Sequence, residues 1–350
     1  MCELRKSREV RIGGVKIGNG NPVAVQSMLN ARADDYEKNL EQCLALEAAG
    51  CDIIRMAVPD AMAVRVLGKL KEHVKAPLVA DIHFDYRLAL ESLEAGVDKI
   101  RINPGNIGSP DRVRAVADAC NARNVPIRIG VNSGSVEKEL LEKYGSPTPR
   151  AMAESAFRHV RMLEECDFYN TVISIKSSDV RTMVRAYETV AAECDYPLHL
   201  GVTEAGTEKS SLIKSSIGIG SLLLNGIGDT IRVSMTADPV REVPAGIGIL
   251  KALGLYKNAP QIISCPTCGR TKIDLVSLAC EIESRLEGCK KPVKVAVMGC
   301  AVNGPGEARE ADIGVAGGNG EGLIFKKGEI VRKVAEKDIV NELMKEIEQL

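Results

Sequence analysis

Residues 77–105 read PLVADIHFDYRLALESLEAGVDKIRINPG, and this stretch contains one strand–helix–strand unit. The runs Pro77–His83 and Lys99–Pro104 have the β-branched, apolar composition of strands, and the segment Asp85–Ala95 between them has the period of an amphipathic helix. A helix that connects two strands in this way is typical of parallel strands in one sheet. The stretch therefore predicts an α/β fold.

The same unit recurs from Pro22 to about Gly254 with a period of about 25 residues. Eight such units close naturally into a (β/α)8 TIM-type barrel of roughly 250 residues. A doubly wound open sheet is the competing architecture, but no strand of the series is followed by a convincing glycine-rich dinucleotide turn. The predicted strands are Val23–Met28, Ile53–Val58, Pro77–His83, Lys99–Pro104, Pro126–Asn132, Thr171–Ser177, Leu198–Glu204 and Thr230–Met235. The predicted helices are Tyr36–Ala49, Ala61–Val74, Asp85–Ala95, Asp111–Arg123, Arg150–Cys166, Asp179–Cys194, Glu208–Asn225 and Pro239–Leu253.

The segments on either side of this series differ from it. Val10–Ile17 alternates around a Gly-Gly pair, which predicts a hairpin that plugs the barrel floor. After Leu255 the rhythm changes to cysteine-containing loops, short strands, a hairpin and a charged helix, which predicts a smaller α+β domain. We expect the barrel to occupy residues 1–256 and the second domain residues 257–350.

The composition restricts the class of protein. Among 350 residues, 45% are hydrophobic and 27% are charged, close to the globular average. The longest uncharged stretch, Ile17–Ala31, is too short for a membrane-spanning helix. With 46 basic and 47 acidic residues, the chain has no general attraction to nucleic acid or anionic membrane. Eleven cysteines in a chain without an export signal favour a cytoplasmic protein with reduced thiols.

Charged and polar residues stand at the predicted carboxyl ends of the strands, where barrel enzymes place their chemistry. Four arginines and one lysine face two carboxylates there, an excess of three positive charges. Mutual pairing across the mouth is one interpretation, and a phosphate or diphosphate substrate is the other, since Arg binds phosphate bidentately. His83 either pairs with Asp81 or serves as a phosphate donor or proton carrier, whereas His73, His159 and His199 are predicted to be surface or core residues. The strand-end residues are Arg55, Asp81, His83, Arg101, Asn103, Arg128, Asn132, Lys176, Glu204, Arg232 and Ser234.

Three cysteines, Cys265, Cys268 and Cys300, fall in loops rich in glycine and proline that allow thiolates to converge on a metal. A structural zinc would need a fourth thiolate or a histidine, which only Cys280 or Cys289 could supply by a helix rearrangement. A [4Fe–4S] cluster tolerates three cysteines and a different ligand at one iron, and Glu307 follows a Gly-Pro-Gly turn that would bring its carboxylate back. We interpret the remaining helical or strand-edge cysteines as small hydrophobic residues: Cys43, Cys51, Cys120, Cys166, Cys194 and Cys280.

With these motifs the sequence resembles, almost from end to end, the bacterial 4-hydroxy-3-methylbut-2-enyl diphosphate synthases, iron–sulfur enzymes of the non-mevalonate isoprenoid pathway. The resemblance is carried by the segments 25–28 (VQSM), 51–55 (CDIIR), 80–84 (ADIHF), 101–106 (RINPGN), 128–135 (RIGVNSGS), 199–206 (HLGVTEAG), 228–234 (GDTIRVS), 265–270 (CPTCGR) and 298–307 (MGCAVNGPGE). It implies a barrel followed by an iron–sulfur cluster domain.

The resemblance also implies an activity and its partners. Such enzymes reductively open 2-C-methyl-D-erythritol 2,4-cyclodiphosphate to the linear allylic diphosphate with two electrons from flavodoxin or ferredoxin. They work as homodimers in which the cluster domain of one chain caps the barrel of the other. Zinc-stabilised aldolase or pterin-type transferase activity on a phosphorylated substrate, and a pure electron carrier or scaffold, are the rival hypotheses.

Carried over residue by residue, the resemblance implies four cluster ligands. Our own hypothesis is that Glu307 would withdraw when substrate oxygen binds the iron. The resemblance also implies a set of diphosphate-binding residues and a set that lines the methylerythritol part, with Glu204 as the proton donor. One departure is the loop Leu29–Ala33, where such enzymes usually carry Thr and Asn. The cluster ligands would be Cys265, Cys268, Cys300 and Glu307; the diphosphate residues Arg55, His83, Arg101, Arg128, Lys176 and Ser234; and the remaining polar residues Asp81, Asn103, Asn132 and Glu204.

Overall fold

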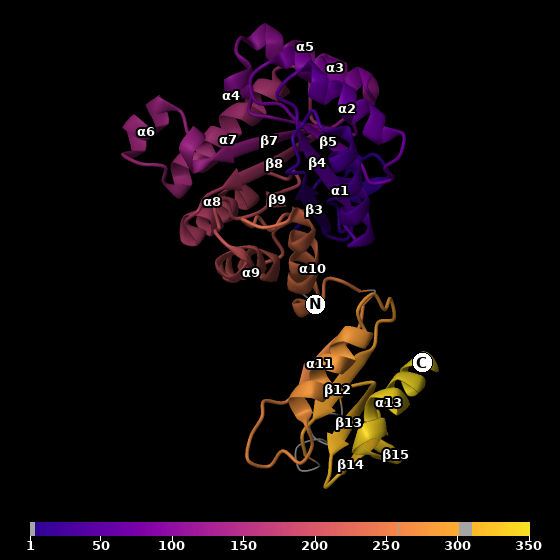
Figure 1. Ribbon diagram of the computed structural model, residues 1–350. Coiled ribbons are helices and arrows are strands. Elements are labelled where there is room, and N and C mark those ends of the chain that lie inside the picture. The colour runs from indigo at the N-terminus through magenta and orange to yellow at the C-terminus, as the bar shows by residue number, and fades with distance from the viewer. Residues whose placement is uncertain (1–3, 258, 301–309) are drawn as a thin grey trace. The chain divides into compact units, whose positions relative to one another are not determined.

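The computed structural model describes residues 4–257, 259–300 and 310–350 (Figure 1). The chain divides into two compact units, Met1–Leu255 and Tyr256–Leu350, and each is described by itself. None of the described helices combines the length and the apolar character that crossing a membrane requires.

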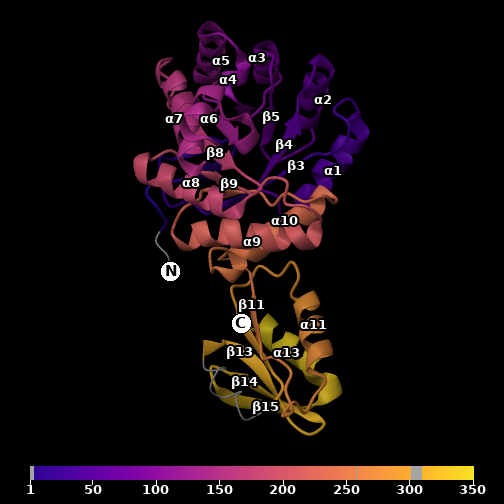
Figure 2. The same ribbon diagram turned by 90° about the vertical axis from the view of Figure 1, so that its left-hand side faces the viewer.

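The first unit is built on a ring of eight parallel strands (Figures 1 and 2). Their order around the ring is β8-β7-β6-β5-β4-β3-β10-β9, and a parallel bridge between Ile173 and Leu198 joins β8 to the residue before β9. The predicted (β/α)8 barrel is therefore confirmed, and the open doubly wound sheet is excluded for this unit. The strands are β3 (Ala24–Met28), β4 (Ile53–Ala57), β5 (Leu78–Asp81), β6 (Lys99–Ile102), β7 (Ile127–Asn132), β8 (Thr171–Lys176), β9 (His199–Leu200) and β10 (Thr230–Ile231).

Helices surround these strands on the outside of the ring. Several begin after an aspartate, such as Asp60 and Asp179, whose carboxylate accepts a backbone N–H of the first helical turn. The helices are α1 (Tyr36–Ala48), α2 (Ala61–Lys71), α3 (Tyr86–Glu94), α5 (Pro110–Arg123), α7 (Pro149–Glu164), α8 (Val180–Glu193), α9 (Glu208–Leu224) and α10 (Glu242–Ala252).

Two local features differ from the sequence-based expectation. Two short helices, α4 (Pro104–Ile107) and α6 (Lys138–Tyr144), follow β6 and β7 and were not predicted. Strands β9 and β10 have two residues each, far fewer than expected. Just beyond β9, the backbone at Gly201 passes close to the backbone that follows β10. A Cβ on Gly201 would lie 2.7 Å from the carbonyl oxygen of Arg232, so this position has no room for a side chain.

The hairpin of β1 (Val10–Ile12) and β2 (Val15–Ile17) closes the amino-terminal end of the barrel. Its buried Val10, Ile12 and Ile17 share one apolar cluster with Ala24, Ile53, Val79 and Val172, residues near the start of strands β3, β4, β5 and β8. Gly13 supplies the left-handed turn, with φ of 53°. The predicted floor is thus confirmed.

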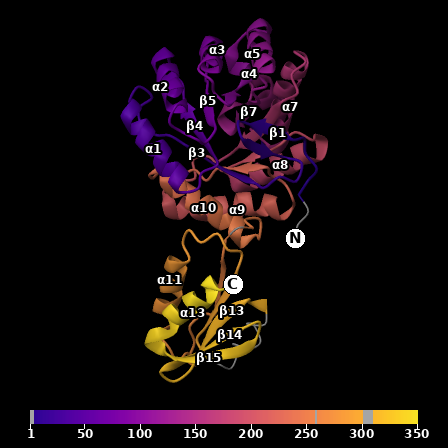
Figure 3. The same ribbon diagram turned by 90° about the vertical axis from the view of Figure 1, so that its right-hand side faces the viewer.

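The second unit has a five-stranded sheet with two helices on one face (Figure 3). β11 (Gln261–Ser264), β12 (Lys294–Met298) and β13 (Ile313–Gly317) are parallel, and β14 (Glu321–Lys326) and β15 (Glu329–Ala335) extend the sheet antiparallel. Helices α11 (Leu275–Arg285) and α13 (Ile339–Glu348) bury their apolar sides against it. The predicted α+β character and the hairpin around Lys327 are confirmed, whereas β11, an edge strand with little burial, was not predicted.

Candidate active site

Strands β4, β5 and β6 bring three charged side chains together at their carboxyl ends. The sheet register aligns Asp81 with Arg101 and Arg101 with Arg128 on the neighbouring strand. Asp81 is 3% exposed. Nη1 of Arg101 donates to Oδ1 of Asp81 at 3.0 Å, and Nε of Arg55 lies 3.6 Å from Oδ2. The carboxylate is therefore shared between two guanidinium groups.

This sharing determines the charge state of Asp81. Burial alone would raise the pKa of its carboxyl group, but the positive charges of Arg55, Arg101 and Arg128 outweigh burial and lower the pKa to about 2. Burial also lowers the pKa of Arg55 to about 10, although Asp81 opposes that change. Asp81 is thus an anion at neutral pH, and it pairs with Arg55 and Arg101 in the ligand-free site.

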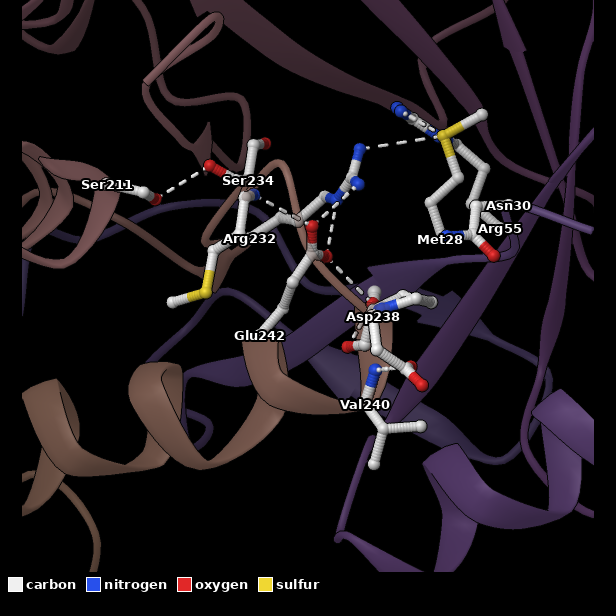
Figure 4. Close-up of polar contacts among 12 residues, drawn as sticks. Met28, Asn30, Arg55, Ser211, Arg232, Ser234, Asp238, Val240 and Glu242 are labelled. Atoms are coloured by element: carbon white, nitrogen blue, oxygen red, sulfur yellow. Dashed lines mark hydrogen bonds and ion pairs between the residues drawn. The ribbon is translucent and has the colours of Figure 1, made fainter. Parts of the chain in front are cut away.

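Arg232 has a carboxylate partner of its own, Glu242 at the start of α10 (Figure 4). Nε and Nη2 of Arg232 each donate to one oxygen of Glu242 at 3.0 Å. The same carboxylate, 2% exposed, accepts from Ser27 Oγ at 2.8 Å and from the Met235 N–H at 3.1 Å. Our sequence-based count of unpaired cations was therefore wrong for Arg232, because a helix supplies the anion that the strand ends lack.

The thioether of Met28 lies between two of these arginines (Figure 4). Its Sδ accepts from Arg55 Nη2 at 2.7 Å and Nε at 3.1 Å, and from Arg232 Nη1 at 3.5 Å. Sulfur is a weak acceptor. These N–H groups consequently keep most of their capacity to bind a stronger acceptor such as a phosphate oxygen.

Three further basic side chains of the barrel strands are buried near these arginines. Lys99, Arg128 and Lys176 are buried, and burial lowers the pKa of each well below its usual value. Arg128 Nη1 donates to Ser174 Oγ at 3.1 Å, but its Nε and Nη2 have no partner among the described residues. Unsatisfied buried donors are costly, so the arrangement favours an anionic ligand.

The remaining predicted residues lie at the ends of strands or on the loops that follow them. Asn103 is buried and its Oδ1 accepts from the Gly105 N–H at 3.1 Å, while Asn132 caps a 3-10 turn and Ser234 is half-buried. His83 is exposed beyond the end of β5, so Asp81 pairs with arginines in preference to it.

Glu204 stands out by its backbone. It is exposed and has φ of 51°, the left-handed region that non-glycine residues rarely adopt. Such conformations concentrate at functional sites.

The unusual first loop has partners within the barrel. Asn30 exchanges two hydrogen bonds with Gln42 of α1, from the Asn30 N–H to Oε1 at 2.8 Å and from Nε2 to Asn30 Oδ1 at 2.7 Å. Leu29 is buried, and its N–H donates to the Arg55 carbonyl. This loop is therefore fixed to α1 and β4.

The three loop cysteines lie in the second unit at the ends of β11 and β12. The N–H of Gly299 donates to Cys265 Sγ at 3.2 Å. Because Gly299 directly precedes Cys300, this bond brings the two cysteine loops next to each other. Backbone and side-chain hydrogen bonds from Arg270 lower the pKa of the exposed Cys268 thiol. Glu307 lies outside the described residues, and within those residues no three His, Cys, Asp or Glu side chains are grouped closely enough to hold a metal ion.

The other cysteines are mostly packing residues, as predicted. Cys43, Cys51, Cys120 and Cys166 are buried. Cys280 contradicts the prediction, because it lies on the exposed side of α11. Cys289 is half-buried against the core of the second unit.

Sequence reasoning missed Glu242, Lys99 and Gln26. Lys99 had a detectable signal, since it precedes Arg101 by two residues and so shares its face of a strand. Gln26 Oε1 lies 3.4 Å from Lys99 Nζ. Glu242 had no such signal, because its position on a helix does not reveal which strand it reaches. His199, expected at the surface or in the core, is buried in the barrel and bonds Thr230 Oγ1 through Nδ1 at 2.7 Å.

We predict that Lys176→Met stabilises the ligand-free protein by roughly 1–3 kcal/mol while it abolishes pyrophosphate binding. The unfolded chain holds the Lys176 proton up to about pH 10.5, whereas the folded chain releases it at lower pH, so stability rises with pH across this window. The free energy of unfolding of Lys176→Met should therefore rise less steeply with pH than that of the wild type. Thermal and urea unfolding between pH 7 and 10, with and without pyrophosphate, measure both effects, and Lys209→Met, at an exposed position of α9, is the control. A less stable variant that still binds pyrophosphate would contradict the analysis.

The chain matches known proteins along nearly its whole length. Residues 7–247 match the GcpE TIM-barrel domain, and residues 261–349 match the GcpE protein C-terminal domain. A relative from Caldanaerobacter subterraneus subsp. tengcongensis is 59% identical, covering 100% of this chain and 99% of its own length. One from Clostridium perfringens is 58% identical, covering 99% of each. Both are named 4-hydroxy-3-methylbut-2-en-1-yl diphosphate synthase (flavodoxin).

Solved structures of other proteins share the barrel. Dihydropteroate synthase of Yersinia pestis is similar with a TM-score of 0.51 and 14% identity, covering 70% of this chain and 98% of its own. The 3-dehydroquinate dehydratase of Geobacillus kaustophilus has a TM-score of 0.52 and 13% identity, covering 71% and 99%. At such identities the likeness concerns the fold alone. The full-length matches in sequence decide the relationship: the chain belongs to the GcpE family.

Proposed function

We propose that this chain is an oxidoreductase that opens 2-C-methyl-D-erythritol 2,4-cyclodiphosphate to 4-hydroxy-3-methylbut-2-enyl diphosphate. The observation that carries the proposal is the buried, incompletely neutralised group of cations at the barrel mouth. Six cationic side chains, Arg55, Lys99, Arg101, Arg128, Lys176 and Arg232, accompany two buried carboxylates, Asp81 and Glu242. A diphosphate supplies the missing negative charge, and its oxygens fit guanidinium donors.

The substrate phosphates would accept hydrogen bonds from arginine donors that have no partner in the ligand-free site. The Nε and Nη2 donors of Arg128 and the buried Nε of Arg101 have no described partner. Arg55 donates to Met28 Sδ in the ligand-free site, and sulfur is a weak acceptor. A phosphate oxygen would take the place of this sulfur as the acceptor. Asp81 and Glu242 hold the guanidinium groups in place before the substrate arrives, which lowers the entropic cost of binding. Asn103 and Asn132 then contact the methylerythritol hydroxyl groups, and His83 and Ser234 add donors for the diphosphate.

Loss of a hydroxyl group as water requires a proton, and Glu204 is our candidate donor. Its left-handed backbone holds the carboxyl group on the loop after β9, at the mouth of the barrel. With the phosphates ionised, the balanced reaction consumes two electrons and one proton and releases one water. Glu204 in its protonated form gives one proton to the departing oxygen and is protonated again from solvent.

The second unit suits a [4Fe–4S] cluster held by Cys265, Cys268, Cys300 and Glu307. The Gly299 N–H that donates to Cys265 Sγ at 3.2 Å is the kind of hydrogen bond that tunes cluster sulfurs. The lowered pKa of the Cys268 thiol favours the thiolate that such a cluster binds. When bound, the cluster would pass electrons to the substrate one at a time.

The proposal includes the electron donor and the setting. Flavodoxin is the donor named for the relatives, and ferredoxin is the alternative. All ten cysteines of the described residues are unpaired, in keeping with a reducing cytoplasm. We further propose a homodimer in which the second unit of one chain caps the barrel of the other, which would exclude water from the reaction.

The first test is metal content and turnover of protein purified without oxygen. We expect about four iron and four sulfide per chain, negligible zinc, and conversion of the cyclic diphosphate with reduced flavodoxin. One zinc without sulfide after anaerobic reconstitution would favour the zinc-stabilised transferase instead. Full cluster content without turnover would refute the substrate.

Glu204→Gln should lower kcat by about 10²-fold or more while KM and the visible spectrum stay unchanged. The loss follows because the amide cannot donate the proton that a carboxylic acid donates. Glu208→Gln, also exposed and close in sequence, is the matched control. Turnover that survives in Glu204→Gln would remove this residue from the mechanism.

The homodimer can be tested by co-expressing two inactive variants, Glu204→Gln and Cys300→Ser, with different tags. Random pairing makes half of the dimers mixed, and each mixed dimer has one site with an intact barrel and an intact partner cluster domain. We expect about a quarter of wild-type activity, found only in doubly tagged dimers. Absence of activity in those dimers would show that both domains act within one chain.

A further inference from the structure

A buried histidine and a glutamate lie behind two of the proposed substrate loops. His159 on α7 is 2% exposed, and its Nε2 lies 3.1 Å from Oε1 of Glu137, whose side chain is 25% exposed. Because a carboxylate only accepts hydrogen bonds, the proton resides on Nε2. Nδ1 of His159 has no partner among the described residues, so this one bond fixes the ring.

The histidine ring supports the turn that follows β6. A Cβ placed on Gly105 would lie 2.9 Å from His159 Nε2 and 3.4 Å from Asn103 Oδ1. The Gly105 N–H in turn donates to Asn103 Oδ1 at 3.1 Å. His159 therefore abuts the residue that orients the Asn103 side chain, and any shift of the ring is passed to Asn103.

The glutamate anchors the segment that follows β7. Glu137 lies five residues after Asn132 and directly precedes α6. The Asn132 N–H donates to Ser135 Oγ at 2.9 Å, and the same hydroxyl donates to the Asn132 carbonyl, so the segment is a tight unit. Burial alone would raise the pKa of Glu137, but hydrogen bonding to His159 and Ser155 and the Glu137 backbone together outweigh burial and lower the pKa to about 2. Glu137 thus stays a carboxylate.

We propose that His159 and Glu137 are positioning residues that lock the turns after β6 and β7 together and so place Asn103 and Asn132 for substrate recognition. The pair acts from behind, through Gly105 and the Asn132–Glu137 segment, without touching the substrate. This inference rests on the proposed function, since it assigns the two asparagines to the methylerythritol part of the substrate. It explains why a histidine is buried in α7 beside the barrel mouth.

The test is the steady-state kinetics of the cluster-loaded full chain on the cyclic diphosphate. His159→Leu and Glu137→Gln should each raise KM about tenfold while kcat changes less than about threefold. His159→Gln keeps an N–H donor toward Glu137 and should restore KM to within about threefold of the wild type. Gly105→Ala pushes on the ring without removing it and should also raise KM. Glu139→Gln is the matched control, because Glu139 lies two residues after Glu137, in the first turn of α6, and its side chain is 78% exposed.

The KM–kcat split separates positioning from mere stability. A variant that only unfolds more readily has fewer active molecules, so its kcat per mole of chain falls while KM is unchanged. Unchanged KM in Glu137→Gln and Gly105→Ala would overturn the proposal, even if His159→Leu failed to fold. Raised KM in both without rescue by His159→Gln would also overturn it. A wild-type chain loaded with cluster yet inactive on the substrate would instead refute the proposed function on which the inference rests.

Discussion

The carboxylate of Glu242 connects two parts of the barrel that are far apart in sequence, the first strand of the ring and the segment around β10. It binds Ser27 on the first strand of the ring, Arg232 just beyond β10, and the Met235 backbone, all from the first residue of α10. The first and last βα units are thereby joined at the end of the barrel where the chemistry takes place. Removing one partner of a buried charge pair costs several kcal/mol, about 3–5, because the other charge is left unpaired. Loss of this carboxylate would therefore leave Arg232 without its ion pair and Ser27 without its hydrogen bond to Glu242.

The cations around this network stay only partly neutralised. Asp81 serves Arg55 and Arg101, and Glu242 serves Arg232, but Lys99, Arg128 and Lys176 are buried with no carboxylate of their own among the described contacts. A fold gives up stability to hold charge in this way, and an anionic ligand restores it. The same buried cations therefore lower the stability of the ligand-free fold and favour binding of an anion. Such a trade-off is common where a site is formed before its ligand binds.

The sequence predicts the barrel well because the βα period depends on local composition alone. The strand-end residues were also identifiable, since parallel strands place their carboxyl ends together. What could not be predicted were contacts set by tertiary packing: the reach of Glu242 from a helix to Arg232, the shortness of β9 beside Gly201, and the partnership of His159 with Glu137. The cysteine motif could be identified from the sequence. The distances between its thiols could not, because they depend on loop conformations that the spacing of the cysteines does not determine.

The β1–β2 hairpin has a consequence for the kinetics of the enzyme. By filling the amino-terminal end with Val10, Ile12 and Ile17, it closes that end of the barrel among the described residues and leaves the carboxyl end as the route to the buried cations. Substrate enters and product leaves by the same route, so the two cannot exchange simultaneously. Each turnover must therefore end with departure of an allylic diphosphate from the cationic mouth, and any anion of similar charge in the cell competes for that one entrance.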